Sequence, residues 1–376
     1  MTQSTPNLLL GLDRLELTSI VEAGGEPKFR VQQLLEAIYR KRVDSIDQLT
    51  TLPQQFRTKL IRGGCSIGLP TVDRRFISRD GTIRYLIAFG DRQSVETVWM
   101  PEGDGGETGD GTEAGESGEI GSRAWNRATI CISSQVGCAV DCQFCLTALL
   151  GVKRNLSAGE IVGQVLRVLS DQNVSPPQDR VNLVFMGMGE PFLNYDNFMK
   201  AVRLLVDEVG IPESRMTVST AGIVPRIYDF GSEPVRPKLA ISLNASNDES
   251  RTRLMPINRK WGLEKLIAAA HEFPLRNRER ITFEYVLLNA VNDATHNAKE
   301  VAELLRGLRC KVNLIALNPG PGIDFSTPDG EGVTAFQNFL IASGIPTFVR
   351  RPRGRDIYAA CGQLKRTVEI ATPPAP

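Results

Sequence analysis

The chain has 376 residues, of which 41% are hydrophobic, a length that suits two or three domains with a sizeable core. It has no run of eighteen apolar residues, and residues 1–6 lack the pattern of a secretory signal, which argues against a membrane-spanning or exported protein. Seven cysteines, four of them between Cys131 and Cys145, fit metal-binding or reactive thiols better than a disulfide framework. We therefore expect a cytoplasmic protein with no membrane partner.

The formal net charge of +1 hides an uneven distribution of charge. Residues 102–122 hold seven acids and no Lys or Arg, so the rest of the chain has a basic excess that suits a polyanion such as RNA. Part of this excess lies in residues 28–63, where apolar residues such as Val31 and Leu34 follow helical spacing. We predict an N-terminal helical RNA-binding accessory domain over residues 1–75, although charge alone leaves a solvated helix face equally open.

Two segments after this domain, residues 82–89 and 94–100, alternate apolar and polar residues as strands do. They predict a strand extension over residues 76–101. Residues 102–123 consist mostly of Gly, Asp, Glu, Thr and Ser, and contain too few hydrophobic residues to offset the entropy of ordering them. We interpret this acidic tract as a disordered surface insertion.

Residues 124–370 alternate between strand-like and helix-like patterns. The predicted strands are largely apolar, as in a parallel sheet buried on both faces. These strands cover residues 128–133, 180–187, 216–221, 238–245, 281–288 and 311–318. The predicted helices cover residues 157–172, 194–209, 225–230, 263–273, 295–308 and 333–342. Six such units predict an α/β fold, a partial (βα)6 TIM-like barrel, with functional residues at the carboxyl ends of the strands.

Three cysteines, Cys138, Cys142 and Cys145, are spaced C-x3-C-x2-C at the end of the first predicted barrel strand. Three thiolates so close together can hold a cubane iron–sulfur cluster and leave its fourth iron open for chemistry. A structural zinc site is the alternative, but it needs a fourth ligand, and neither His271 nor His296 lies at a suitable spacing. The spacing resembles the radical S-adenosylmethionine (SAM) superfamily, in which SAM occupies the open iron of a [4Fe-4S] cluster.

Three longer motifs accompany the cysteines: residues 129–138, residues 186–191 with the sequence MGMGEP, and residues 353–364 with the sequence RGRDIYAACGQL. Together they resemble the bacterial dual-specificity RNA adenine C2 methyltransferases. That family consists of radical SAM enzymes that act on an adenosine of 23S rRNA and on adenosine 37 of some tRNAs. The resemblance covers roughly residues 28–370, apart from the acidic insertion, which the family pattern lacks.

The resemblance implies a role for two further cysteines and one acid. Cys361 would accept a methyl group from one SAM, and a radical formed from a second SAM would activate that methyl group for addition to carbon 2. Cys131 would then attack the sulfur of Cys361, release the RNA and leave a disulfide. Glu96 matches the family's proton acceptor. The family also implies a low-potential electron donor such as flavodoxin or ferredoxin.

The resemblance further implies a set of SAM contacts at the ends of the predicted strands. They are Gly189, Glu190, Ser219, Ser242, Leu243, Asn244 and Asn318. We expect the glycines of residues 186–191 to let the backbone approach the ligand, and Glu190 to accept from its ammonium group. Asn244 departs from the family, which usually has His at this position; Asn cannot titrate, so a backbone role is the safer expectation.

Two alternatives stay open at this point. A sister family methylates carbon 8 of the same rRNA adenosine with the same cysteines. An RNA-binding scaffold with a structural cluster is the alternative that involves no catalysis. Four arginines just before Cys361 favour RNA binding in either case, since they could hold a phosphate backbone; they are Arg350, Arg351, Arg353 and Arg355.

Overall fold

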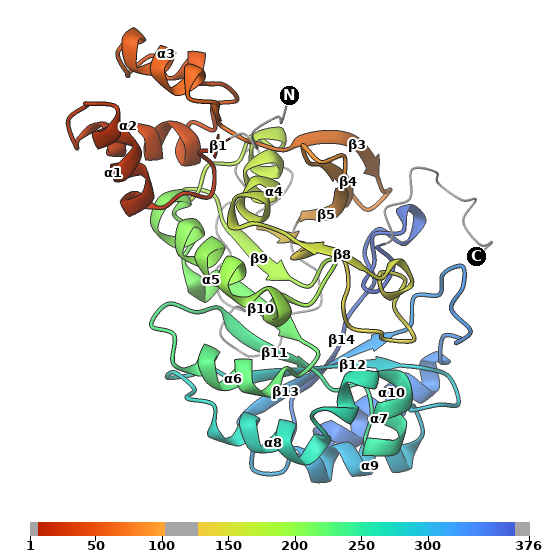
Figure 1. Cartoon of the computed structure of the whole chain (residues 1–376). Helices are drawn as coiled ribbons and strands as arrows, with labels where there is room; N and C mark the ends of the chain where they lie inside the picture. Colours follow the sequence, from red (N-terminus) through yellow and green to blue (C-terminus); the bar gives the residue numbers. More distant parts are fainter. Residues whose placement is uncertain (1–6, 102–126, 365–376) are drawn as a thin grey trace.

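The structure is a computed structural model that describes residues 7–101 and 127–364 of the chain (Figure 1). The described residues form a curved sheet covered by helices. The tract predicted to be a disordered insertion, residues 102–123, lies outside the described residues. None of the helices in the described ranges has the length and apolar character that crossing a membrane requires.

A ten-stranded mixed sheet organises the molecule, in the order β14-β13-β12-β11-β10-β9-β6-β5-β4-β3. From β6 to β14 neighbouring strands pair in parallel. These strands are β6 (Ala128–Cys131), β9 (Val181–Phe185), β10 (Met216–Thr220), β11 (Lys238–Ser242), β12 (Ile281–Leu287), β13 (Cys310–Ala316) and β14 (Thr347–Val349). The six predicted barrel strands are confirmed. The sequence did not reveal β14, because three residues are too short a run to show a period.

Three antiparallel strands extend the sheet beyond β6: β5 (Ser94–Pro101), β4 (Ile83–Ala88) and β3 (Thr71–Ile77). The first two agree with the predicted strand extension. The edge strand β3 was missed, because Phe76 is its only buried residue and the usual alternation is therefore absent.

Helices follow the parallel strands and cover the outer face of the sheet (Figure 1). They are α4 (Ala158–Asp171), α5 (Tyr195–Leu204), α6 (Val224–Gly231), α7 (Asp248–Leu254), α8 (Leu263–Glu272), α9 (Thr295–Leu304) and α10 (Gly330–Ala342). A capping box formed by Ser157 and Glu160 begins α4. Of these helices only α7 was not predicted, because every residue before its final Leu254 is polar or charged and no apolar period is visible.

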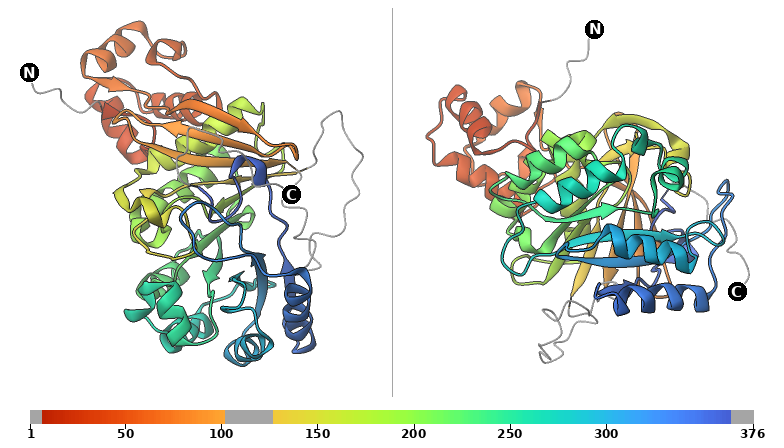
Figure 2. Two further views of the ribbon diagram at one scale, coloured as in Figure 1. Left: turned by 90° about the vertical axis from the view of Figure 1, so that its right-hand side faces the viewer. Right: turned by 90° about the horizontal axis from the view of Figure 1, so that it is seen from below.

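A small helical unit precedes the sheet and lies beside α4 and α5 (Figures 1 and 2). It contains α1 (Arg14–Ala23), α2 (Arg30–Leu35), the π-helical turn Glu36–Arg40, α3 (Gln54–Arg62) and the short strands β1 (Asn7–Leu8) and β2 (Cys65–Ser66). Lys200 of α5 contacts Glu16 at 2.6 Å, and the Arg42 guanidinium donates to the carbonyl of Val174 at 2.6 Å. The unit is thus fastened to the barrel by polar contacts as well as by packing.

Candidate active site

The loop that carries the three cysteines is held by a short hairpin. Strands β7 (Gln135–Gly137) and β8 (Val152–Asn155) pair on either side of it. Gly137 has φ +81°, and a Cβ there would lie 1.8 Å from the carbonyl oxygen of Gly151. Only glycine fits this position, so the residue before Cys138 fixes where the loop begins.

The thiols of Cys138, Cys142 and Cys145 line one cavity of about 170 Å³. Burial raises the pKa of Cys138 to about 12 and that of Cys142 well above its usual value. Within the described residues, no three Cys, His, Asp or Glu side chains surround a single metal-ion position. The thiols are arranged around a space instead, which fits a cubane cluster, because each thiolate there binds a different iron.

Most of the predicted SAM contacts line the same cavity. They are Gly189, Glu190, Ser219, Ser242, Asn244 and Asn318. They come from the carboxyl ends of β9, β10, β11 and β13, as the barrel architecture predicts. Leu243 is the exception: its side chain is fully buried, and its carbonyl accepts from Arg251 at 3.0 Å.

Glu190 is buried at the end of β9 and already accepts two hydrogen bonds. Its oxygens take the amides of Phe192 at 2.9 Å and Ala221 at 2.6 Å. Burial raises the pKa of Glu190 to about 7, although these amides act in the opposite direction. A cationic ligand in the cavity would lower that pKa again, because an opposite charge favours the carboxylate.

The glycines of the MGMGEP motif, Gly187 and Gly189, line the cavity and also meet a packing requirement that the sequence did not reveal. A Cβ on Gly187 would lie 2.7 Å from the carbonyl oxygen of Ile132, and one on Gly189 would lie 2.6 Å from Gln135. Both clashes are with the protein segment that leads into the cysteine loop. The glycines therefore allow two neighbouring loops to pack closely, and through that contact they shape the cavity.

Asn244 has a positive φ of 57°, which Asn tolerates better than most residues do. Its side-chain oxygen accepts the amide of Val286 at 2.8 Å, and its carbonyl accepts from Asn292 at 2.9 Å. These bonds join the ends of β11 and β12. The side chain at this position, where the family usually has His, is thus occupied in holding the cavity wall.

Cys131 and Cys361 lie far apart in sequence but line a common second cavity of about 100 Å³. Cys361 is exposed and also lines the cavity of the cysteine triad, so it joins the two spaces. Burial raises the pKa of Cys131 to about 12; the neighbouring Cys361 raises it further, whereas the amide of Met186 and Arg350 lower it. The disulfide that the resemblance implies between Cys131 and Cys361 is not formed in this structure.

The segment that carries Cys361 is anchored at both ends. On one side, the Arg353 guanidinium donates to the carbonyl of Pro101 at 2.9 Å, and Ser78 bonds Asp356 at 2.5 Å. On the other, Leu146 donates its amide to the carbonyl of Gly362 at 2.8 Å. These bonds place Cys361 directly over the cysteine loop. They also hold the Arg353 guanidinium against the protein through one of its nitrogens.

Glu96 is fully buried in β5 and forms an ion pair with Arg84, which is also fully buried. Its side chain lines neither of the two cavities described above. Val98 and Met100, two and four residues further along β5, do line the Cys131 cavity. Because every second residue of a strand faces the same way, Glu96 belongs to that face of the sheet.

Residues 132–305 match the model of the radical SAM superfamily, and residues 7–64 match the ribosomal RNA large subunit methyltransferase N-terminal domain. The chain is also 68% identical over 352 residues to the probable dual-specificity RNA methyltransferase RlmN of Koribacter versatilis, in a match that covers 94% of this chain and 99% of that protein. The chain belongs to the dual-specificity RNA methyltransferase RlmN family.

Two further relatives support this membership. The dual-specificity RNA methyltransferase RlmN of a Nitratiruptor species is 43% identical, and the match covers 90% of this chain and 93% of that protein. The crystal structure of a radical SAM methyltransferase from Sphaerobacter thermophilus matches with a TM-score of 0.83 at 41% identity, and covers 96% of this chain and 99% of that chain. Membership of this RlmN family within the radical SAM superfamily implies a [4Fe-4S] cluster and SAM as cofactors.

One residue that shapes the RlmN site was not found from the sequence. Arg251 of α7 is fully buried and donates to the carbonyls of Ala221, Ser242 and Leu243 at 2.8, 2.9 and 3.0 Å, and to Asn258 at 2.8 Å. Burial lowers the pKa of Arg251 to about 10. This one side chain therefore ties together the ends of β10 and β11 beneath the cavity.

Proposed function

We propose that the enzyme transfers a methyl group from SAM to carbon 2 of an adenosine in 23S rRNA and of adenosine 37 in tRNAs. The observation that carries this proposal is the shared cavity of Cys131 and Cys361, which meets the cavity of the cysteine triad at Cys361 itself. The chemistry needs such an arrangement, because carbon 2 of adenine is not a nucleophile and the methyl group must be activated on the protein first.

Cys138, Cys142 and Cys145 would hold the cluster, and Gly189, Glu190, Ser219, Ser242, Asn244 and Asn318 would surround SAM. Leu243 would contribute through its position in the backbone only. When bound, the cluster and SAM supply a 5′-deoxyadenosyl radical, which can remove a hydrogen atom from a methyl group. The exposure of Cys361 between the two cavities suits a thiol that is first methylated and then attacked from the other side.

Cys131 completes the reaction from the second cavity. Its thiolate attacks the sulfur of Cys361, and the bond between that sulfur and the methylene carbon on the RNA breaks. The electron pair of this bond leaves with the carbon, which gains a proton and becomes the methyl group. Arg350 supports the step, because its charge counteracts the effect of burial on the pKa of Cys131.

Glu96 is the proposed acceptor of the proton that carbon 2 loses once the methylene group has added to it, and the unpaired electron of that adduct would return to the cluster. The Arg84 guanidinium beside it favours the ionised carboxylate, which is the form that can accept a proton. Its position on the face of β5 that lines the Cys131 cavity supports this role.

The remaining partners follow from the chemistry. A cluster of this kind needs a one-electron donor of low potential, such as flavodoxin or ferredoxin. The N-terminal helical unit, with Lys41 and Arg57 among its basic residues, is the proposed RNA-binding accessory domain. Because both RNA substrates occur in the cytoplasm, we place the enzyme there.

The test is anaerobic reconstitution with iron and sulfide, followed by incubation with SAM, a reductant and RNA. We expect 5′-deoxyadenosine and RNA methylated on carbon 2, with the position mapped by mass spectrometry. A methyl group on carbon 8 would identify the sister reaction instead. If no RNA methylation occurred and Cys361→Ala left RNA affinity unchanged, a scaffold with a structural cluster would be the correct interpretation.

A further inference from the structure

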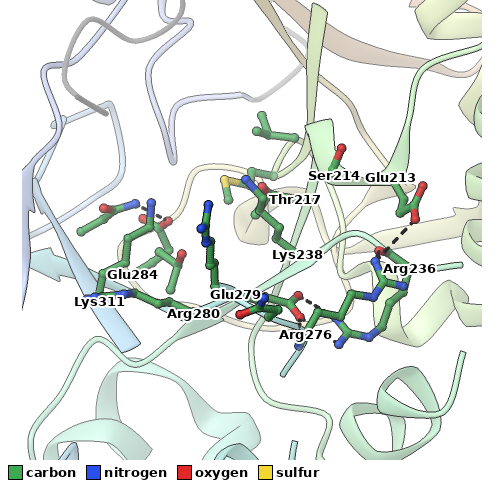
Figure 3. Close-up of a pocket in the computed structure, with 16 residues that line it drawn as sticks. Glu213, Ser214, Thr217, Arg236, Lys238, Arg276, Glu279, Arg280, Glu284 and Lys311 are labelled. Carbon is green, nitrogen blue, oxygen red and sulfur yellow. Dashed lines mark hydrogen bonds and ion pairs between the residues drawn. The ribbon is translucent and has the colours of Figure 1, made fainter. Parts of the chain in front are cut away.

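A separate cavity of about 290 Å³ lies at the amino ends of the barrel strands (Figure 3). Its wall is formed by side chains that point into the barrel, among them Thr217, Lys238, Thr282 and Lys311. Barrel interiors are normally packed with branched apolar residues. A polar, hollow amino end is therefore unusual, and the RNA chemistry described above does not account for it.

The charges around this cavity fall into two groups. The first group consists of charges that are paired within the protein. Arg236 forms an ion pair with Glu279 at 2.7 Å, and Arg276 forms one with Glu213 at 3.6 Å. Glu284 accepts a hydrogen bond from Asn313 at 3.0 Å and lies 3.7 Å from Arg350. The second group includes Arg278 of the loop before β12 together with Lys238, Arg280 and Lys311, and we call the last three the amino-end cations. In the described part of the chain, no ion pair joins any of these three to a carboxylate.

The amino-end cations come from neighbouring strands. Lys238 begins β11, Arg280 directly precedes β12, and Lys311 is the second residue of β13. Figure 3 shows all three side chains along the same cavity. Three cations along one cavity, without ion-paired carboxylates of their own among the described residues, favour the binding of an oxyanion there.

The position of the cavity relative to the cysteines can be followed through the sheet register. Cys131 pairs with Val184, Val184 with Thr217, and Thr217 with Lys238. Three strand spacings separate Cys131 from Lys238, or about 14 Å along the sheet. Met186 and Glu284 line both this cavity and that of the cysteine triad, so one layer of side chains separates the two.

We propose that Lys238, Arg280 and Lys311 bind backbone phosphates of the RNA a few nucleotides from the adenosine whose base reaches Cys361. This inference rests on the proposed RNA methylation. RNA is favoured over a free phosphate because the site lies within reach of the reacting base and has three separate cations along one wall, which suits successive phosphates. The hydroxyls of Ser214, Thr217 and Thr282 in the wall can donate to the same oxyanions.

The test measures the salt dependence of RNA binding by the reconstituted enzyme, with 23S rRNA that lacks the methyl group. The variants are Lys238→Gln, Arg280→Gln, Lys311→Gln and the triple variant. Each lost phosphate contact should lower the slope of log K against log salt by about 0.7, and weaken binding about fivefold at about 0.1 M salt. For the triple variant we expect a slope change of about 2 and binding weaker by about 100-fold. Lys238→Arg, which keeps the charge, should restore the slope.

The matched control is Lys265→Gln, since Lys265 is an exposed lysine on the outer helix α8. Methyl transfer from SAM to Cys361 is measured in parallel, because it needs no RNA and reports whether the cofactor site is intact. If the triple variant keeps the slope of the control, the inference is wrong. A free anion would give a different result. In that case inorganic phosphate raises the unfolding temperature of the parent but not of the triple variant, while the two proteins have the same slope of log K against log salt for RNA. That result would overturn the assignment to RNA. Absence of RNA methylation by the unsubstituted enzyme would instead refute the proposed function.

Discussion

The two ends of the barrel strands differ in how their charged groups are paired. At the carboxyl ends, Arg251 donates to three carbonyls and an amide oxygen, and Glu190 accepts two backbone amides. At the amino ends, Lys238, Arg280 and Lys311 face a cavity with no ion-paired carboxylate of their own among the described residues. The same strands therefore end in a site where Arg251 and Glu190 are hydrogen-bonded within the protein, and begin in one where three cations have no ion-paired carboxylate in the described ranges.

This contrast separates two tasks. Groups that are fixed by internal hydrogen bonds need no rearrangement when a cofactor binds, so they can orient it for radical chemistry. Cations without internal partners contribute little to a rigid geometry, but they attract a large polyanion and release its counterions on binding. Substitutions at the carboxyl end should therefore affect chemistry and stability, whereas those at the amino end should affect RNA affinity.

Cys361→Ala should have the largest effect, since it removes the proposed methyl acceptor. We expect RNA methylation to fall below detection while RNA still binds. Liquid chromatography with mass spectrometry of digested RNA measures the methyladenosine, and a filter-binding assay measures affinity. Cys65→Ala, which removes a half-buried thiol of β2 outside both cavities, is the control. Methylated RNA from the Cys361 variant would show that the site at the carboxyl ends of the strands does not use this thiol as its methyl acceptor.

Cys131→Ala should stop the reaction after the RNA has become attached to Cys361, at the step that releases it. Without the second thiol, the methylene bridge between Cys361 and RNA is not broken, so a covalent enzyme–RNA adduct should accumulate. A denaturing gel with labelled RNA detects the adduct as a slowly migrating band, and nuclease treatment trims the attached RNA and makes that band migrate faster. The double variant Cys131→Ala with Cys361→Ala should give no adduct. Free methylated RNA from the Cys131 variant would show that another group releases the product.

Arg251→Lys tests whether the carboxyl end is as rigid as its hydrogen bonds indicate. The planar fork of Arg cannot be reproduced by Lys, so several buried carbonyls lose their donors. We expect a loss of about 3 kcal/mol in the free energy of unfolding, measured with urea. Arg253→Lys, on the exposed side of the same helix, should change it by no more than about 0.5 kcal/mol. Equal effects for the two would contradict the tie between β10 and β11.

The sequence predicted the parts of this site that are local in the chain. The spacing of Cys138, Cys142 and Cys145 and the apolar runs of six barrel strands are visible within short windows, and the structure contains both the strands and the clustered thiol loop. The resemblance added Cys131 and Cys361, and the structure brings them to one cavity. Their separation in sequence shows why spacing alone could not have paired them.

What the sequence missed depends on contacts between distant segments. Arg251 looks like an exposed helical charge until its partners at the ends of β10 and β11 are known. Arg353 was grouped with RNA-binding arginines, and its contact with the carbonyl of Pro101 was not predicted. The cations Lys238 and Lys311 lie on predicted strands, but only the pairing register of the sheet shows that both side chains line one cavity. In each case the missing information was the identity of the neighbours in space.

Glu190 offers the most specific test, since its effect should appear only with changing pH. Burial raises the folded-state pKa of this carboxyl from its usual value of 4.5 to about 7, so the folded protein holds a proton that the unfolded chain releases. The resulting stabilisation is complete below about pH 4.5 and is lost as the pH rises to about 7. Relative to Glu190→Gln, which does not titrate, the free energy of unfolding should therefore fall by up to about 3 kcal/mol across this window.

Urea unfolding of the cluster-free protein between about pH 5 and 8, without SAM, gives this difference directly. Glu264→Gln, which removes an exposed carboxylate of α8, controls for the loss of one surface charge. In the reconstituted protein, saturating SAM should flatten the pH dependence of the parent, because the positive charge of SAM favours the carboxylate and lowers the pKa. If the difference in the free energy of unfolding between the parent and Glu190→Gln does not vary with pH, Glu190 is already ionised without a ligand. Water would then reach the carboxyl ends of the strands more than the burial of Glu190 suggests.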